Sequence, residues 1–288
     1  MCECGITHNA ANRYDPTQTT TLRRQFEGEA GRRFRWLKGR IREAIVAEDG
    51  FGLKTNAGRF DFPRSADKVS AFMDWLNKMQ EQGILEVRQG EPLSKAAERS
   101  WATTYVRSAY AKGMAGSAAK LRSQGVEVAD DWVREAFSRP FHADRVGLAY
   151  TRTFEELRGI TREMDRQISR ELAEGLAAGK NSRDIAAKLN DRVDKIGITR
   201  SRMMARTETI RAHAEASLNT YKEAGVEGVG VQAEWVTAQD GAVCAECESA
   251  AASGPYTVDE AQGMIPLHPN CRCAWIPLVE NPRGVALR

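Results

Sequence analysis

The sequence lacks any run of eighteen or more apolar residues, although apolar residues make up 42% of its 288 positions. A helix needs about twenty such residues to cross a bilayer, so no membrane span is expected. The opening Met1-Cys-Glu-Cys-Gly-Ile has neither a basic stretch nor an apolar core, and we therefore expect no signal peptide. Clustered cysteines in a reducing cytosol favour metal ligation, and disulfides become the alternative if the protein lives outside a cell.

The chain also lacks a large net charge. Its 42 Lys and Arg residues oppose 39 Asp and Glu residues, which leaves +3. Total charge therefore gives no argument for nucleic-acid binding, and only a local cluster can support one. The composition is too apolar for wholesale disorder, and the length suits two domains or one domain with a long extension.

Patterns of catalytic residues are missing as well. Three of the four histidines, His8, His142 and His213, are isolated in the sequence, whereas a zinc-supported nuclease needs a general-base histidine near its cation. No phosphate-binding loop and no convincing Ser/His/Asp order is present. We expect neither an enzyme nor a small-molecule substrate.

Potential metal ligands, in contrast, are concentrated in thirty residues near the carboxyl end: Cys244, Cys247, His268, Cys271 and Cys273. A C-x2-C pair can point both sulfurs at one centre, and a second segment usually completes a tetrahedral zinc site. If Cys271-Arg-Cys273 is extended, its two sulfurs face the same side. If a turn follows Pro269, His268 pairs with Cys271 instead. We predict about one structural zinc per chain, held by four of the five ligands, with His268 or Cys273 as the fourth.

Asp240 and the two amino-terminal cysteines have two interpretations each. Asp240 either orients a ligand and bonds N–H groups of the C-x2-C turn, or is an ordinary turn aspartate. Cys2 and Cys4 are either half of a second metal site or two free thiols on a mobile terminus. Trp235 and Trp275 are expected to pack beside the metal as core.

A basic amphipathic helix is predicted from Thr19, capped by one of Thr19, Thr20 and Thr21. Its apolar stripe runs Leu22, Phe26, Ala30, Phe34, Leu37, Ile41 and Ile45. Eight basic residues oppose only Glu27 and Glu29 over twenty positions: Arg23, Arg24, Arg32, Arg33, Arg35, Lys38, Arg40 and Arg42. Such a face contacts DNA phosphates, an anionic membrane or an acidic protein, or it is a solvated face whose arginine stems cover apolar neighbours.

Further helices follow from apolar residues spaced three or four apart and from cap residues such as Ser65 and Ser182: residues 65–83, 94–123, 130–139, 142–178, 183–189 and 199–224. Gly113 and Gly116 weaken the second of these, and they let another backbone approach closely. Only after residue 225 does the pattern alternate, which predicts a strand over 229–236 and a return strand over 274–279.

The predicted fold is therefore mainly α, with an extended helical amino-terminal part and a small carboxyl-terminal α+β module of the zinc-knuckle type. Residues 1–18 are expected to form a flexible arm, and residues 19–197 a helical assembly and docking domain. Residues 198–279 form the metal-binding module, and 280–288 a tail.

Several motifs of this module occur in a recognisable order. Ala205-Arg-Thr-Glu-Thr lies on a helix and precedes Trp235-Val-Thr-Ala-Gln-Asp240, the C-x2-C pair and His268-Pro-Asn-Cys-Arg-Cys273. In this order, over about residues 205–277, the chain resembles the phage Mu protein F-like head morphogenesis family, the minor head proteins of tailed bacteriophages.

The resemblance implies a low-copy head protein with no assigned catalytic residue. The family's cysteines and histidine correspond to Cys244, Cys247, His268, Cys271 and Cys273. It further implies a place at the portal vertex or the inner capsid of the virion, after synthesis in the cytoplasm of a bacterial host. The expected partners are the portal protein, the major capsid protein and packaged DNA, without a membrane. The alternative is a DNA-binding accessory protein, ejected with the genome, that uses the basic helix.

Overall fold

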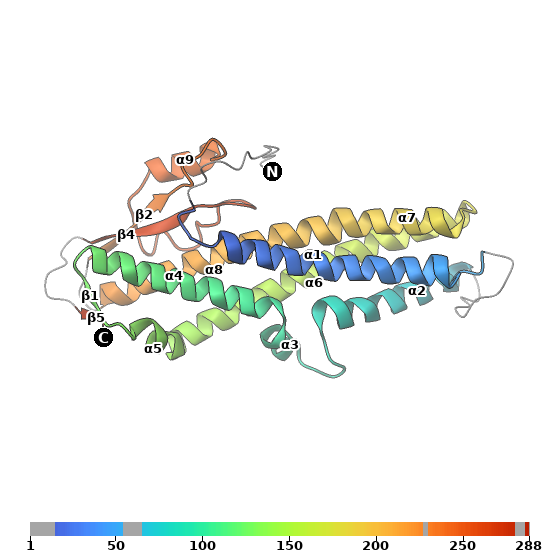
Figure 1. The fold of residues 1–288 in the computed structure, drawn as a ribbon, viewed down its shortest axis with the longest axis horizontal. Helices are drawn as coiled ribbons and strands as arrows, with labels where there is room; N and C mark the ends of the chain where they lie inside the picture. Colours follow the sequence, from blue (N-terminus) through green and yellow to red (C-terminus); the bar gives the residue numbers. More distant parts are fainter. Residues whose placement is uncertain (1–14, 54–64, 227–229, 280–285, 288) are drawn as a thin grey trace. The chain divides into compact units, whose positions relative to one another are not determined.

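The computed structural model describes residues 15–53, 65–226, 230–279 and 286–287 (Figure 1). Cys2, Cys4, His8 and residues 54–64 lie outside these residues, as does most of the predicted arm and tail. The described chain is mainly helical, with a small antiparallel sheet near its carboxyl end, as predicted. None of its helices is both long and apolar enough to span a bilayer.

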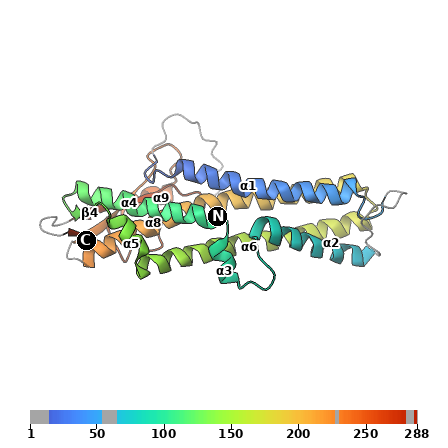
Figure 2. The same cartoon turned by 60° about the horizontal axis from the view of Figure 1, so that its bottom comes forward.

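The helices, with π-helical turns marked η, are α1 (Thr20–Arg42), η1 (Glu43–Ala47), α2 (Ser65–Gln80), η2 (Glu81–Leu85), α3 (Leu93–Arg99), α4 (Ala102–Ser123), α5 (Trp132–Ser138), α6 (Pro140–Ala177), α7 (Ser182–Arg192), η3 (Val193–Ile198), α8 (Thr199–Val226) and α9 (Ala245–Ala252). The strands are β1 (Glu127–Val128), β2 (Val231–Val236), β3 (Tyr256–Thr257), β4 (Ala274–Val279) and β5 (Ala286–Leu287). Figure 2 shows the same elements from a second direction, with α6 as the longest helix.

The chain forms two compact units, each built from segments that are distant in the sequence. Unit 1 consists of the described residues within Met1–Gln25, Trp101–Tyr150 and Ala205–Arg288. Unit 2 consists of those within Phe26–Ser100 and Thr151–Met204.

In unit 2, apolar stripes of α1, α2 and α6 form the core. The stripe of α1 is buried from Phe26 to Ile41 and continues to Ile45 in η1, as its spacing predicts. Glycines allow two aromatic rings to pack directly on a helix backbone. A Cβ atom at Gly197 would lie 2.4 Å from the Phe34 ring, and one at Gly83 would lie 2.1 Å from the Trp36 ring. Gly83 therefore does not end the second helix: η2 continues through it to Leu85.

Of the caps predicted for α1 and α7, the position of the first is right and the second is wrong. Thr19 directly precedes α1 and its carbonyl oxygen accepts the Arg23 amide at 2.8 Å, while the amide of Thr20 donates to Asp15 Oδ2 at 2.8 Å. At α7 the cap is Asn181, whose Oδ1 accepts the Asp184 amide at 3.0 Å. The Ser182 hydroxyl instead donates to Asp49 Oδ1 at 3.2 Å.

Unit 1 depends on a close approach of α4 and α8. A Cβ atom at Gly113 would lie 2.4 Å from the carbonyl oxygen of His213, so only glycine fits there. Gly116 faces open space and has no such role. The single helix predicted over 94–123 is two helices, because α3 ends at Arg99 and α4 begins at Ala102.

Unit 1 has a three-stranded sheet of order β3-β2-β4, in which β4 returns antiparallel to β2, as predicted, and a parallel pair of short strands, β1 and β5. Its register places Trp235 opposite Trp275, and the two buried indoles meet edge to face with centroids 5.2 Å apart. Side chains at the end of α4 bond to β4. Gln124, the residue that follows the helix, accepts the Val279 amide through Oε1 at 3.0 Å, and Lys120 Nζ donates to Trp275 O at 3.4 Å.

Candidate metal centre

The first pair of cysteines stands at the amino-terminal end of α9. Cys244 is the residue before the helix, and its Sγ accepts the backbone N–H of Cys247 at 3.4 Å. Both sulfurs therefore lie at the first helical turn, where free backbone N–H groups stabilise negative charge. The C-x2-C spacing thus caps a helix and pairs two ligands at once.

The second ligand segment is shaped by a turn at His268-Pro-Asn-Cys271. The amide of Cys271 donates to His268 O at 3.1 Å, and Asn270 has φ 65°. Proline suits the second position of such a turn, and asparagine tolerates the positive φ of the third. The turn predicted after Pro269 is present, and it brings His268 and Cys271 to the same end of the loop.

The two arrangements that the sequence posed as alternatives occur together. Cys271 and Cys273 are both buried, and their sulfurs lie within 4.8 Å of each other and of Cys247 Sγ. Cys244, Cys247 and His268 form a second group under the same limit. All five predicted ligands therefore gather around Cys247, which belongs to both groups.

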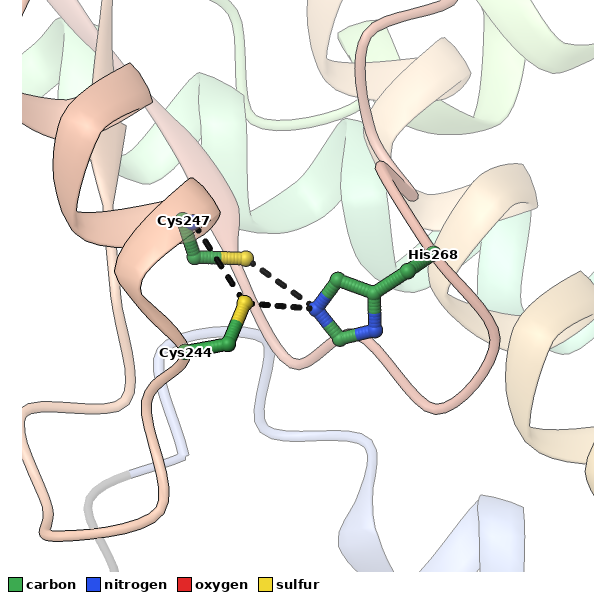
Figure 3. A group of neighbouring side chains, drawn as sticks. All are labelled: Cys244, Cys247 and His268. Atoms are coloured by element: carbon green, nitrogen blue, oxygen red, sulfur yellow. Dashed lines mark hydrogen bonds between the residues drawn. The ribbon is translucent and has the colours of Figure 1, made fainter. Parts of the chain in front are cut away.

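The distances within the cluster are close to those between ligands of one metal ion. His268 Nε2 lies 3.2 Å from both Cys244 Sγ and Cys247 Sγ (Figure 3), and the sulfurs of Cys247 and Cys271 are 3.9 Å apart. Tetrahedral zinc separates two sulfurs by about 3.8 Å, and a sulfur from a nitrogen by about 3.6 Å. The sulfur pair matches this geometry, and the imidazole is a few tenths of an ångström too close.

The histidine already has the tautomer that a metal requires. Its Nδ1 lies 2.8 Å from the carbonyl oxygen of Pro269. Because a carbonyl oxygen only accepts, Nδ1 carries the proton and Nε2 keeps a free lone pair that points at the two sulfurs.

The crowded thiols shift one another's pKa values in opposite directions. Hydrogen bonds with Cys271 and Cys273 raise the pKa of Cys247 well above its usual range, whereas hydrogen bonds with Cys247 and Cys273 lower the pKa of Cys271. Neighbouring thiolates repel, so one ionises at the expense of the next. A soft cation removes this conflict, and the donor set of thiols and one imidazole fits zinc.

Asp240 joins the two ligand segments. Its carboxylate accepts two hydrogen bonds from Arg272, each 2.6 Å long, and Oδ1 also accepts the Ala242 amide at 3.1 Å. These hydrogen bonds to Asp240 raise the pKa of Arg272 despite its partial burial. The carboxylate thus bonds the C-x2-C turn, as one of its two interpretations proposed, and adds a bidentate bond to the residue between Cys271 and Cys273.

Helix α8 supports the same loop through Thr207, a residue of the Ala205-Arg-Thr-Glu-Thr motif. The amide of Asn270 lies 3.4 Å from Thr207 Oγ1. Its neighbour Glu208 is buried and pairs with Arg211 on the same helix.

Comparison with known proteins gives one match. Residues 166–276 match the family described as Phage Mu protein F like protein. This segment, somewhat more than a third of the chain, is similar to the phage Mu F-like family. No curated protein matches the chain, and neither does any solved structure. The Mu F-like segment contains all five clustered ligands, which confirms the resemblance. It begins inside α6, earlier than the motifs at Ala205 indicated.

The other described histidines do not take part in the ligand cluster of the Mu F-like segment. His142 is fully buried, with Tyr110 Oη 2.9 Å from Nδ1 and Glu223 Oε2 3.1 Å from Nε2. His213 is buried too, and burial, with the charge of Lys120 adding to it, lowers its pKa to about 4. Both are core residues of unit 1.

Most of the basic residues of α1, which precedes the Mu F-like segment, form ion pairs within the chain. The pairs are Arg23–Asp15, Arg32–Glu29, Arg33–Glu29, Arg33–Glu86, Lys38–Asp194 and Arg40–Glu43. Arg24, Arg35 and Arg42 are exposed and make no ion pair with a residue that the structure describes. The local excess of positive charge is therefore concentrated on these three side chains.

Proposed function

We propose that this protein is a minor head protein that acts without catalysis in phage head morphogenesis, bound at the portal vertex or the inner capsid of the virion. The observation that carries the proposal is the Mu F-like match over residues 166–276, which contains the whole ligand cluster. In this proposal residues 19–197 dock on the portal or capsid protein, and residues 198–279 form the metal-stabilised module.

The partner is tested by mixing the full chain with purified portal oligomers and sedimenting the mixture through a gradient. We expect the chain to migrate with the portal, and a Mu F-like protein assembled into particles to remain with the capsid after washing in high salt. Failure to associate with both portal and capsid particles contradicts the proposed place in the virion.

We further propose that the cluster holds one structural zinc ion through Cys244, Cys247, His268 and Cys271. The imidazole contacts both C-x2-C sulfurs, and Cys271 Sγ lies at the ligand spacing from Cys247. Four protein ligands leave no position for a reactive water, so the ion stabilises the fold instead of driving a reaction. Cys273 then remains a buried thiol beside the site.

The ligand set is tested by measuring bound metal in single variants. Cys244→Ser, Cys247→Ser, His268→Gln and Cys271→Ser are expected to lose the zinc of about one per chain, because each removes one of four ligands. Cys273→Ser is the matched control and keeps it. If His268→Gln retains zinc while Cys273→Ser loses it, the fourth ligand is Cys273. A metal-free protein with disulfides among these cysteines contradicts the zinc site itself.

A second candidate function is DNA binding by the basic helix. It is favoured by the arginines of α1 that remain exposed without an ion pair in the described chain. The two functions are compatible, because a protein at the portal vertex lies beside packaged DNA.

A further inference from the structure

Two guanidinium groups converge above one glycine of α1. Gly31 is buried, and a Cβ atom placed on it would lie 3.1 Å from Arg35 Nη1. The same atom would lie 3.2 Å from Nε and 3.3 Å from Nη2 of Arg202, which belongs to α8. The side chains of Arg35 and Arg202 therefore cover the same point of the helix backbone, within unit 2.

Neither arginine has an acidic partner in the described part of the chain. Like charges that share one point repel each other, so an arrangement of this kind is stabilised when an anion lies between them. Guanidinium groups bind oxyanions through two parallel N–H donors each, and phosphate offers enough oxygens for two such groups.

The face of α1 that carries Gly31 and Arg35 also carries two further glycines. Gly28, Gly31, Arg35, Gly39 and Arg42 recur at spacings of three and four, so they lie on one face of α1. No atom would lie within 4 Å of a Cβ at Gly28 or Gly39, so the backbone is open there. Arg42 continues this arginine–glycine strip about 10 Å beyond Arg35.

We propose that Arg35 and Arg202 together bind one phosphate of the DNA backbone, with Arg42 as a neighbouring contact on the arginine–glycine strip. The inference rests on the second candidate function and names its contact residues. A bare glycine surface lets a wide, stiff duplex approach, and repeated phosphates match cations that recur along one helix face. An acidic protein partner fits less well, since the strip lacks the apolar anchors found at the centres of protein interfaces.

The site is tested by measuring the affinity of the full chain for duplex DNA over a range of salt concentrations. Losing one phosphate contact lowers the slope of log affinity against log salt by about 0.9, for every DNA sequence alike. Because both arginines hold the same phosphate, Arg35→Gln and Arg202→Gln should each produce nearly the whole effect of the double variant. Arg40→Gln is the matched control: it removes the same charge from the same helix, but Arg40 is paired with Glu43.

Gly31→Ala tests the geometry without changing charge. Its methyl group would push both guanidinium groups outward by a few tenths of an ångström, so we expect a small loss of DNA affinity with the salt slope unchanged. Gly159→Ala is the control, because it adds a methyl group to α6 where no atom lies within 4 Å.

The outcomes are distinct. Equal losses in Arg35→Gln and Arg40→Gln, or additive losses in the double variant, overturn the shared phosphate site while DNA binding itself stands. No salt-dependent DNA binding by the unaltered chain overturns the function and the site together. Binding of poly-glutamate instead of DNA, with the same dependence on Arg35, reassigns the site to an acidic protein.

Discussion

At the scale of single residues, Asp165 on α6 shows how burial makes stability depend on pH. Burial raises its pKa to about 6, although the hydrogen bond from Gln80 lowers it. An unfolded aspartate has a pKa of about 3.9, so the folded state binds more protons between these values. This carboxyl therefore stabilises the fold below about pH 4 and loses that contribution as the pH rises to about 6.

Replacing Asp165 with asparagine keeps an acceptor for Gln80 and removes the charge. We expect Asp165→Asn to be more stable than the unaltered protein at pH 8, by about 1–2 kcal/mol, and equally stable at pH 3. Urea unfolding at several pH values measures the difference. His213, whose pKa is lowered to about 4, acts in the opposite direction between pH 4 and 6.5. Because His213 is present in both proteins, its contribution cancels in the difference between their free energies of unfolding. A difference that does not vary with pH contradicts the role given to burial.

At the scale of elements, helix α7 begins at a cap that adjacent polar residues conceal in the sequence. Asn181 accepts the Asp184 amide, and removing such a cap costs about 1 kcal/mol. We expect Asn181→Ala to lose this amount in urea unfolding and Asn181→Ser to restore most of it. If Asn181→Ser is as unstable as Asn181→Ala, the side chain contributes something other than its capping oxygen.

The apolar stripes, the long helix α6 and the strand pair could be predicted because each depends on spacing within one segment. The cap of α7 could not, because the Ser182 hydroxyl bonds to Asp49, which lies more than a hundred positions away. Gly83 was expected to end a helix, but the ring of Trp36 packs on it and the helix continues. The break between α3 and α4 has no glycine or proline to announce it.

The same contrast holds for the two sites. The five potential ligands lie close together in the sequence, so their spacing revealed the cluster. The Arg272–Asp240 bond could be found only by noticing that Arg272 must point away from Cys271 and Cys273. Nothing in the sequence indicates a role for Arg202. Its guanidinium group meets that of Arg35 only at Gly31, which belongs to a helix far upstream.

At the scale of the whole molecule, the proposed zinc stabilises a unit that extends well beyond its ligands. Gln124 Nε2 donates to Pro277 O at 2.5 Å, so α4 is bonded to the strand that follows Cys273. We expect chelation of the metal to lower amide protection in α4 as well as in β2 and β4, whereas α2 and α7 of unit 2 keep theirs. Hydrogen exchange with mass spectrometry measures this peptide by peptide.

Cys244→Ser is the control for the chelator. Amide protection in this variant should be low before chelation, and adding the chelator should not lower it further. Loss of protection confined to residues 240–273 would contradict the wider effect and would indicate a module that folds independently of α4.

Unit 1 is built from segments that are distant in the sequence, so parts of it are synthesised well before the segments they pack against. The apolar face of α4, with Val106, Met114 and Leu121, leaves the ribosome long before β4, the strand that its side chains hold. At 5–20 residues per second the interval between Leu121 and Val279 is about 8–30 s. Until then α4 can pack only on segments made before β4, such as α5 and α8, and we expect the part of its apolar surface that β4 covers to remain exposed on the nascent chain.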